Sequence, residues 1–170
     1  ARLQPPQDAV VPIGRMAIYE ALDRPDDLEA AIAQSHAMLE RTGMRAMEDP
    51  VIFFEGRTHE MRGDWQAAME TYQRKRDNDP TDYTVPEQLG RCYLELGRLD
   101  RAEDLILETL ALRPSYARAH YDLALVYERM GRAEDAISHL RRALDTWAPA
   151  DESFPWAQRA KAKLAELEAS

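Results

Sequence analysis

The chain is poor in several residue types and patterns, and each absence excludes a class of protein. It has a single cysteine, Cys92, so no intramolecular disulfide can form. No apolar run approaches the roughly 18 residues that a membrane-spanning helix needs. Aromatic residues make up only 8% of the chain. Valine, isoleucine and threonine are sparse beside alanine, leucine, glutamate and arginine, and this balance favours helices over strands.

Motifs for catalysis and cofactor binding are also missing. The histidines, His36, His59, His120 and His139, include no His-x-x-x-His pair and none lies beside a cysteine cluster, so no metal site is predicted. The glycines form no phosphate-binding loop. Cys92 and His59 could approach each other on neighbouring helices, and a cysteine beside a histidine can act as a nucleophile. No oxyanion-hole loop or third catalytic group accompanies them. We therefore predict no enzyme activity and no cofactor.

The charge balance is strongly acidic. Aspartate and glutamate number 31 against 22 lysines and arginines, which gives a formal net charge of −9. A surface of this kind repels phosphate backbones, so binding to nucleic acids or anionic membranes is disfavoured. No signal peptide is visible at Ala1, which favours the cytoplasm, while the missing initiator methionine leaves a removed leader open.

A period of 34 residues organises the centre of the chain. Small residues in the series mark the places where two helices approach closely, and each central glycine marks a short turn that needs positive φ. Pro80 and Pro114 close the first two copies, where a helix must stop. The series that keep this interval are Gly56, Gly90 and Ala124; His59, Tyr93 and Tyr127; Gly63, Gly97 and Gly131; Ala68, Ala102 and Ala136; and Tyr72, Ile106 and Leu140.

This pattern resembles the tetratricopeptide repeat (TPR). Three in-register copies occupy residues 49–82, 83–116 and 117–150 and are recognisable through residue 148. Glu55 and His59 depart from the usual residues, so the first copy matches the family least well. The resemblance implies an all-α fold, a right-handed superhelical α-solenoid of antiparallel helix pairs.

The segment before the repeats is predicted to form a degenerate helix pair over residues 10–48. Its first helix covers residues 10–22, and its second begins at Asp26 or Asp27 and ends at Thr42 and Gly43. Residues 1–9 contain two adjacent prolines and are predicted to form a linker or disordered arm.

The segment after the repeats, residues 149–170, is predicted to form a capping helix over residues 154–168. Asp151 or Ser153 can cap its first turn. Its mixed polar face suits a helix that covers the last repeat, since terminal repeats of stacked arrays need a polar outer side.

The resemblance also implies a function. Members of this family bind a peptide or a helix of a partner protein in a concave groove lined by the first helix of each repeat, and they are not enzymes in themselves. Aromatic and arginine side chains are common at the energetic centres of such interfaces. The residues at the family's inward positions are Phe53, Arg57, Met61, Glu87, Arg91, Leu94, Arg118, Tyr121, Leu125 and Arg129.

Three of these inward residues, Arg57, Arg91 and Arg118, stand out in an acidic chain. The planar guanidinium group binds a carboxylate through two hydrogen bonds, so they can meet an acidic segment of a partner. They can equally pair with carboxylates of the chain itself, since most surface charges are solvated or paired. The nearest such acids in the sequence pattern are Glu60, Glu87 and Glu95.

Two other functions stay open at this stage. The array can be a structural domain that self-associates through Phe154, Trp156 or the N-terminal helix, or it can be an auxiliary domain of a longer enzyme or signalling protein. Binding of heat-shock chaperone tails is not implied, because Phe53, Arg57 and Gln88 replace the lysine and asparagines with which one TPR subfamily grips a C-terminal carboxylate.

Overall fold

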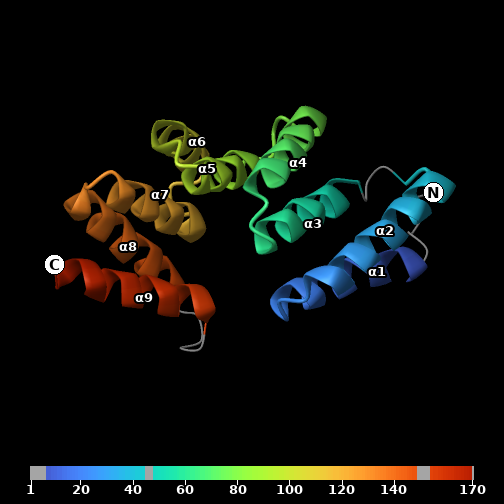
Figure 1. Cartoon of the computed structure of the whole chain (residues 1–170), viewed down its shortest axis with the longest axis horizontal. Helices are drawn as coiled ribbons and strands as arrows, with labels where there is room; N and C mark the ends of the chain where they lie inside the picture. The colour runs from blue at the N-terminus through green and yellow to red at the C-terminus, as the bar shows by residue number, and fades with distance from the viewer. Residues whose placement is uncertain (1–6, 45–47, 149–153, 170) are drawn as a thin grey trace. The chain divides into compact units, whose positions relative to one another are not determined.

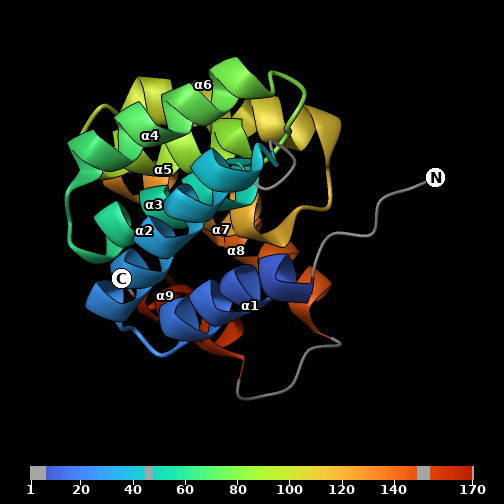
Figure 2. The ribbon, with the colours of Figure 1, turned by 90° about the vertical axis from the view of Figure 1, so that its right-hand side faces the viewer.

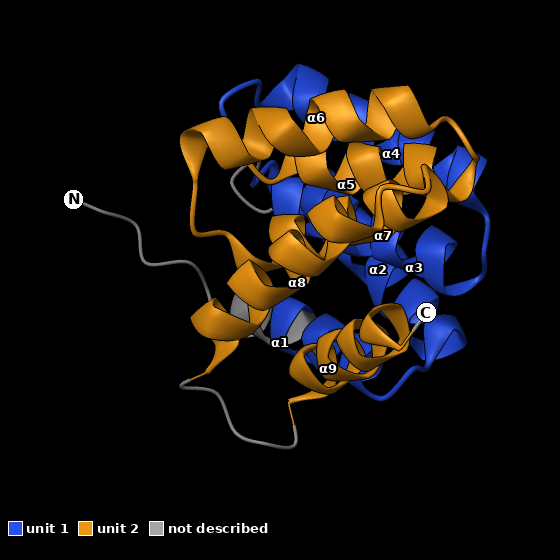
Figure 3. Cartoon of the chain, turned by 90° about the vertical axis from the view of Figure 1, so that its left-hand side faces the viewer, with its two compact units in different colours: residues 1–81 blue, residues 82–170 orange. Residues whose placement is uncertain are grey.

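The computed structural model describes residues 7–44, 48–148 and 154–169, with side chains from residue 13 onward. Within these ranges every regular element is an α-helix (Figure 1). The chain divides into two compact units, residues 1–81 and residues 82–170 (Figure 3). The first predicted repeat therefore groups with the N-terminal helix pair, a division that the 34-residue period did not indicate.

Unit 1 contains four described helices, which pack in chain order, and α1 also contacts α3 (Figure 2). Its core is formed by apolar side chains spaced three or four residues apart, including Met16, Leu28, Ile32, Val51 and Phe54. The helices are α1 (Gln7–Ala21), α2 (Pro25–Thr42), α3 (Glu48–Met61) and α4 (Trp65–Asn78).

Unit 2 contains five described helices, and each packs against the next along the chain, with a further contact between α5 and α7. Its core includes Leu94, Ile106, Leu123 and Leu140, and α9 adds Ala160 to it. The helices are α5 (Val85–Glu95), α6 (Leu99–Leu112), α7 (Ala117–Arg129), α8 (Ala133–Trp147) and α9 (Pro155–Glu168).

The same turn joins the two helices of each pair. The turn glycines have positive φ, which confirms the prediction made from their spacing: 73° at Gly63, 74° at Gly97 and 76° at Gly131. Asp23 takes this place between α1 and α2, with φ of 53°. The amide of the following residue donates to the carbonyl five positions earlier, at Arg24–Tyr19, Asp64–His59, Arg98–Tyr93 and Arg132–Tyr127.

Close approach of the paired helices agrees with the small residues of the repeat. A Cβ atom at Gly90 would lie 2.6 Å from Ile106 Cγ1 and 3.2 Å from the Ala102 carbonyl oxygen. At Gly56 it would lie 2.4 Å from the ring of Tyr72, not against Ala68. At Gly56 and Gly90 the side chain that faces the glycine thus belongs to the Tyr72–Ile106–Leu140 series. This series lies one helical turn after the alanine series.

The ends of the N-terminal helices differ from the prediction. Helix α1 begins at Gln7, so residues 7–9 are helical rather than part of a linker, since their residue types tolerate a first turn. Helix α2 begins at Pro25, with Arg24 at the N-cap, and Asp26 lies inside the first turn. Proline suits the first helical position because its missing N–H has no helical partner there. Gly43 follows the helix with φ of 65°, as expected.

The C-terminal helix begins at Pro155, one residue later than predicted. Phe154 occupies the N-cap position and makes no side-chain hydrogen bond there. The two capping candidates, Asp151 and Ser153, lie outside the described residues.

Candidate functional site

The residues predicted to line the groove fall in both units. Those of unit 1 all lie on α3, whereas those of unit 2 lie on α5 and α7. The unit 1 residues are Phe53, Arg57 and Met61, and the unit 2 residues are Glu87, Arg91, Leu94, Arg118, Tyr121, Leu125 and Arg129.

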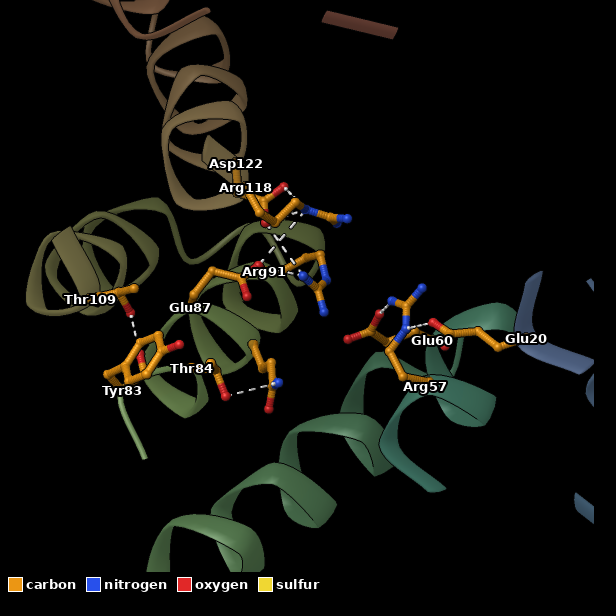
Figure 4. A network of polar contacts seen from close by, with 11 residues as sticks. Glu20, Arg57, Glu60, Tyr83, Thr84, Glu87, Arg91, Thr109, Arg118 and Asp122 are labelled. Carbon is orange, nitrogen blue, oxygen red and sulfur yellow. Dashed lines mark hydrogen bonds and ion pairs between the residues drawn. The ribbon is translucent and has the colours of Figure 1, made fainter. Parts of the chain in front are cut away.

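In unit 1, Arg57 pairs with carboxylates of the chain itself (Figure 4). Its Nε donates to Glu20 Oε1 at 2.6 Å, and its Nη1 donates to Glu60. Glu20 comes from α1 and was not part of the predicted site. Phe53 and Met61 are partly buried against the unit 1 core, so only part of each side chain is available for contact.

In unit 2, four charged residues from α5 and α7 form one cluster, which we call the polar cluster (Figure 4). Arg118 Nε lies 3.1 Å from Asp122 Oδ1 and 3.0 Å from Oδ2. Arg91 donates to Glu87 one turn earlier on α5, and its Nη1 also lies 3.4 Å from Asp122 Oδ2. Glu87 and Asp122 are almost fully buried, at 2% and 1% exposure, so all four groups are fixed by their neighbours.

The two carboxyl groups of the polar cluster are in different protonation states. Burial raises the pKa of Glu87 to about 8; the Arg91 guanidinium opposes this shift, and a hydrogen bond to Asp122 adds to it. Burial also works against ionisation of Asp122. The charges of Arg118 and Arg91, together with a hydrogen bond to Glu87, nevertheless hold the pKa of Asp122 below its usual range. A protonated Glu87 can accept from Arg91 through one oxygen and donate to Asp122 through the other. At neutral pH the cluster thus holds two guanidinium groups and one carboxylate.

Arg118 also contacts an aromatic group that the sequence placed only in the C-terminal cap. Its Cζ lies 3.6 Å from the ring centroid of Trp156, and Arg159 Cζ lies 4.6 Å from the same centroid. Arg159 is exposed and makes no hydrogen bond or ion pair with any described residue. The sequence had singled out Trp156 only as a possible self-association contact, not as a neighbour of Arg118.

The remaining predicted residues of unit 2 differ in exposure. Tyr121 is 8% exposed, because its ring packs 5.8 Å from Trp156 and 6.2 Å from Trp147. Leu94 is fully buried, and its carbonyl oxygen accepts from Arg129 at 2.6 Å. Arg129 also pairs with Glu95 at 3.0 Å, while Leu125 is partly buried against the core.

These contacts show whether the inward arginines pair with acids of the chain itself. Arg57 pairs with Glu60 and Arg91 pairs with Glu87, as expected. Arg118 pairs with Asp122, which the sequence did not name, and Glu95 pairs with Arg129 instead. Pairing with neighbouring acids, one of the two alternatives from the sequence, is therefore confirmed. A partner carboxylate can reach these arginines only by sharing or displacing an existing contact.

The side chains considered for catalysis occupy structural positions. The thiol of Cys92 is buried at 0% exposure, so no substrate can reach it without local opening. Among residues 7–44, 48–148 and 154–169, no three or more histidine, cysteine, aspartate or glutamate side chains are placed to hold a metal ion. None of the helices in the same ranges combines the length and apolar character needed to cross a bilayer.

Comparisons with known proteins agree with the repeat pattern. Two family models, both described as tetratricopeptide repeat, match residues 61–111 and 88–152. The chain is 35% identical over 79 residues to the TPR repeat-containing thioredoxin TTL4 of Arabidopsis thaliana, a match that covers 46% of the chain and 12% of that protein. It is 31% identical over 77 residues to the tetratricopeptide repeat and J domain-containing co-chaperone DNJ1 of Fusarium oxysporum, covering 45% of the chain and 15% of that protein. The matches thus span a small part of each relative.

Solved structures share the fold at low sequence identity. A thermophilic TPR protein of Thermus thermophilus has a TM-score of 0.69 at 18% identity, over 95% of this chain and all of that one. PcrH, solved with the chaperone binding region of PopD, has a TM-score of 0.61 at 22% identity, over 69% of this chain and 89% of that one. The first TPR of Spaghetti (RPAP3), bound to an HSP90 peptide, has a TM-score of 0.61 at 21% identity, over 71% of this chain and 93% of that one. With the matching family models and the all-helical fold, these likenesses establish that the chain belongs to the tetratricopeptide repeat family and has its helical solenoid fold.

Proposed function

We propose that this chain is a non-enzymatic recognition module that binds a peptide or helix of a partner protein along the first helices of its repeats. The family is typically a protein-interaction fold, and relatives with the same fold are described in complex with peptides or partner segments. In unit 2 the proposed contact surface consists of Arg118, Leu125, Arg129, Trp156 and Arg159, which the buried Arg91 and Tyr121 support through Asp122 and Trp156. Unit 1 has a proposed contact surface of its own, which consists of Phe53, Arg57 and Met61.

The observation that carries this proposal is the polar cluster with its flanking tryptophan. Burying several ionised groups contributes little to stability, because desolvation offsets their attraction. Such a cluster does hold its donors in fixed positions, and preorganised donors lose less entropy when they bind a ligand. With Glu87 protonated, the cluster has one more positive than negative charge. We therefore propose an acidic segment as the partner, with Arg159 and Arg129 as its more exposed contacts.

The test uses variants that leave the buried network intact. The chain is used to capture its partner from an extract of the source organism, and the recovered protein is titrated by calorimetry. Arg159→Glu should weaken binding about tenfold or more, because the arginine is exposed and lies beside Trp156. Arg101→Glu on α6 is the matched control, since Arg101 is 65% exposed and lies 3.9 Å from its nearest carboxylate.

The outcomes separate the possible contact surfaces. Binding that weakens with Arg159→Glu, falls as salt rises and is unchanged by Arg101→Glu supports the proposal. Equal affinities for wild type and Arg159→Glu, with a loss for Arg101→Glu, would show that a different face of unit 2 contacts the partner.

Self-association is a second candidate, and one observation in unit 1 favours it. Ile18 on α1 and Leu22, directly after its end, are 56% and 59% exposed and form a pair of exposed large apolar side chains. Light scattering over a range of concentrations tests it. A mass that rises with concentration in wild type, and stays constant after Ile18→Lys with Leu22→Glu, would favour a structural domain that assembles through α1.

An auxiliary role in a longer protein is the third possibility. The names of two relatives join TPR repeats to a thioredoxin or a J domain, and the chain matches only 12% and 15% of their lengths. The full open reading frame that encodes the chain tests this possibility directly.

A further inference from the structure

Two histidines of unit 2 face each other between α7 and α8. His120 on α7 and His139 on α8 place their Nδ1 atoms 3.0 Å apart, and their ring centroids are 5.1 Å apart. The other nitrogen of His120, Nε2, lies 2.8 Å from the Pro114 carbonyl oxygen in the turn before α7. The pair therefore links the two helices of the last repeat to the preceding turn.

The geometry fixes where the protons lie. A carbonyl oxygen only accepts, so His120 Nε2 must carry a proton and donate it to Pro114. A neutral His120 then has an unprotonated Nδ1, and the 3.0 Å contact requires His139 Nδ1 to be the donor. His139 can accept one further proton on Nε2 without losing this bond. A second added proton would have to reside on His120 Nδ1, where it would face the N–H of His139 and bring two charged rings together.

The surroundings of the pair disfavour binding of even the first added proton, the one on His139 Nε2. Burial and the neighbouring His120 lower the pKa of His139 to about 4, and Arg142 and Arg132 add to this, while Asp135 opposes it. Burial and Arg142 also lower the pKa of His120, against the effect of the bond to Pro114. From α7, Tyr127 packs its ring 5.4 Å from that of His139. From α6, Glu103 accepts from Arg132 at 3.0 Å, so it offsets part of that charge.

We propose that the His120–His139 contact is an acid-released latch, which holds α8 against α7 at neutral pH and lets them separate in acid, because separated rings can each take up a proton whereas the paired rings cannot both do so. Helix α8 carries the fully buried Ala136, Leu140 and Ala143, and α9 packs on it. Opening the latch therefore loosens the C-terminal end of unit 2 first. This device is independent of whether the chain binds a partner.

The sign of the effect follows from the folded-state pKa values. Both lie below the ordinary value of 6.5, so the unfolded chain binds protons more readily than the folded one. The stabilisation is complete above about pH 6.5 and is lost as the pH falls towards the folded value of His139, about 4. The raised pKa of Glu87 acts in the opposite direction, so it cannot produce this loss.

The first test is nitrogen-15 NMR of the histidine rings in wild type at neutral pH. We expect His139 to carry its proton on Nδ1, His120 to carry its proton on Nε2, and both to titrate below the ordinary value. A His139 that is protonated on Nε2 alone, or that titrates at the ordinary value, overturns the latch whatever the variants do.

The second test compares amide exchange in α8 at about pH 7 and about pH 5, corrected for intrinsic exchange. In wild type, opening should increase about tenfold or more, since each unit of pKa difference corresponds to a tenfold change. His139→Asn keeps a donor near the Nδ1 position but cannot take up a proton, so it should reduce this increase to the part that His120 contributes. His36→Asn is the control, because His36 is a half-exposed histidine of unit 1. An equal acid-induced increase in wild type and His139→Asn rejects the proposal.

Discussion

The guanidinium group of Arg118 lies between Asp122 and Trp156. Its Nε is 3.0 Å from Asp122 Oδ2, and its Cζ is 3.6 Å from the centroid of the indole ring of Trp156. A single side chain thus connects the polar cluster of α5 and α7 to α9. Lys163 makes a second connection between the same helices, 3.0 Å from Glu128. Helix α9 is therefore fixed to α7 by polar contacts as well as packed on α8.

Removing α9 should disrupt the rest of unit 2. Deleting residues 155–170 removes Ala160 and Trp156 from the unit 2 core and uncovers the side of α8 on which α9 packs. We expect aggregation, or a loss of helicity beyond that of the deleted segment, because a terminal repeat needs a polar outer side. Circular dichroism and light scattering measure both, with Lys161→Ala as an exposed control. A monomeric truncation with all remaining helices intact would show that α9 is dispensable.

Gly90 and Gly14 should respond in opposite ways to the same substitution. A Cβ at Gly90 falls 2.6 Å from Ile106 Cγ1 and close to backbone, so Gly90→Ala should lower the free energy of unfolding by about 1–3 kcal/mol. A Cβ at Gly14 meets nothing within 4 Å, so Gly14→Ala should raise it by up to about 1 kcal/mol through helix propensity. Urea denaturation measures both. Equal midpoints for the two variants would contradict the close packing of α5 on α6.

Replacing each acid of the polar cluster by its amide should change the free energy of unfolding by different amounts. Glu87 is already uncharged at neutral pH, so Glu87→Gln should change the free energy of unfolding by less than about 1 kcal/mol. Asp122 is ionised and paired with Arg118 and Arg91, so Asp122→Asn should cost about 3–5 kcal/mol. A larger loss for Glu87→Gln than for Asp122→Asn would reverse the assignment of the proton.

The raised pKa of Glu87 should also make stability depend on pH in the alkaline range. Its folded pKa of about 8 lies above the ordinary 4.5, so the folded state holds the proton more tightly. This contribution is fully present below the ordinary value and is lost as the pH rises through 8. We expect the urea midpoint of wild type to fall between about pH 6 and about pH 9, and that of Glu87→Gln to fall less. Glu134→Gln, at an exposed site on α8, should follow wild type.

Cys92 should report the opening of unit 2. Its side chain has no exposed surface, so a thiol reagent should label it only when α5 opens. We expect slow labelling that accelerates in Gly90→Ala, since the two residues share α5. Ellman's reagent gives the rate directly. Stoichiometric labelling within the mixing time would show that the thiol is accessible in the folded state.

The 34-residue period determined the helix pairs and their turns without any tertiary information. Gly63, Gly97 and Gly131 have the positive φ that their spacing predicted, because a short turn between antiparallel helices imposes the same backbone conformation each time. The family followed from the same spacing. Helix ends were less certain, as at Pro25 and Pro155, because several neighbouring residues can begin a helix at similar free energy.

The partners and the burial of the candidate site residues were decided only by the tertiary structure. The sequence placed Arg57, Arg91 and Arg118 at inward positions and left open whether they meet acids of a partner or of the chain. Each has an acid three or four residues away on its own helix, but the further contacts depend on which helices meet. Glu20 and Asp122 became partners through packing of α1 on α3 and of α5 on α7. Burial then changed the chemistry: it left Glu87 protonated, made Tyr121 part of the core and brought Trp156 against Arg118. The local sequence pattern fixes where one helix ends and the next begins. The burial of a side chain and its contacts with other helices depend on which helices pack together.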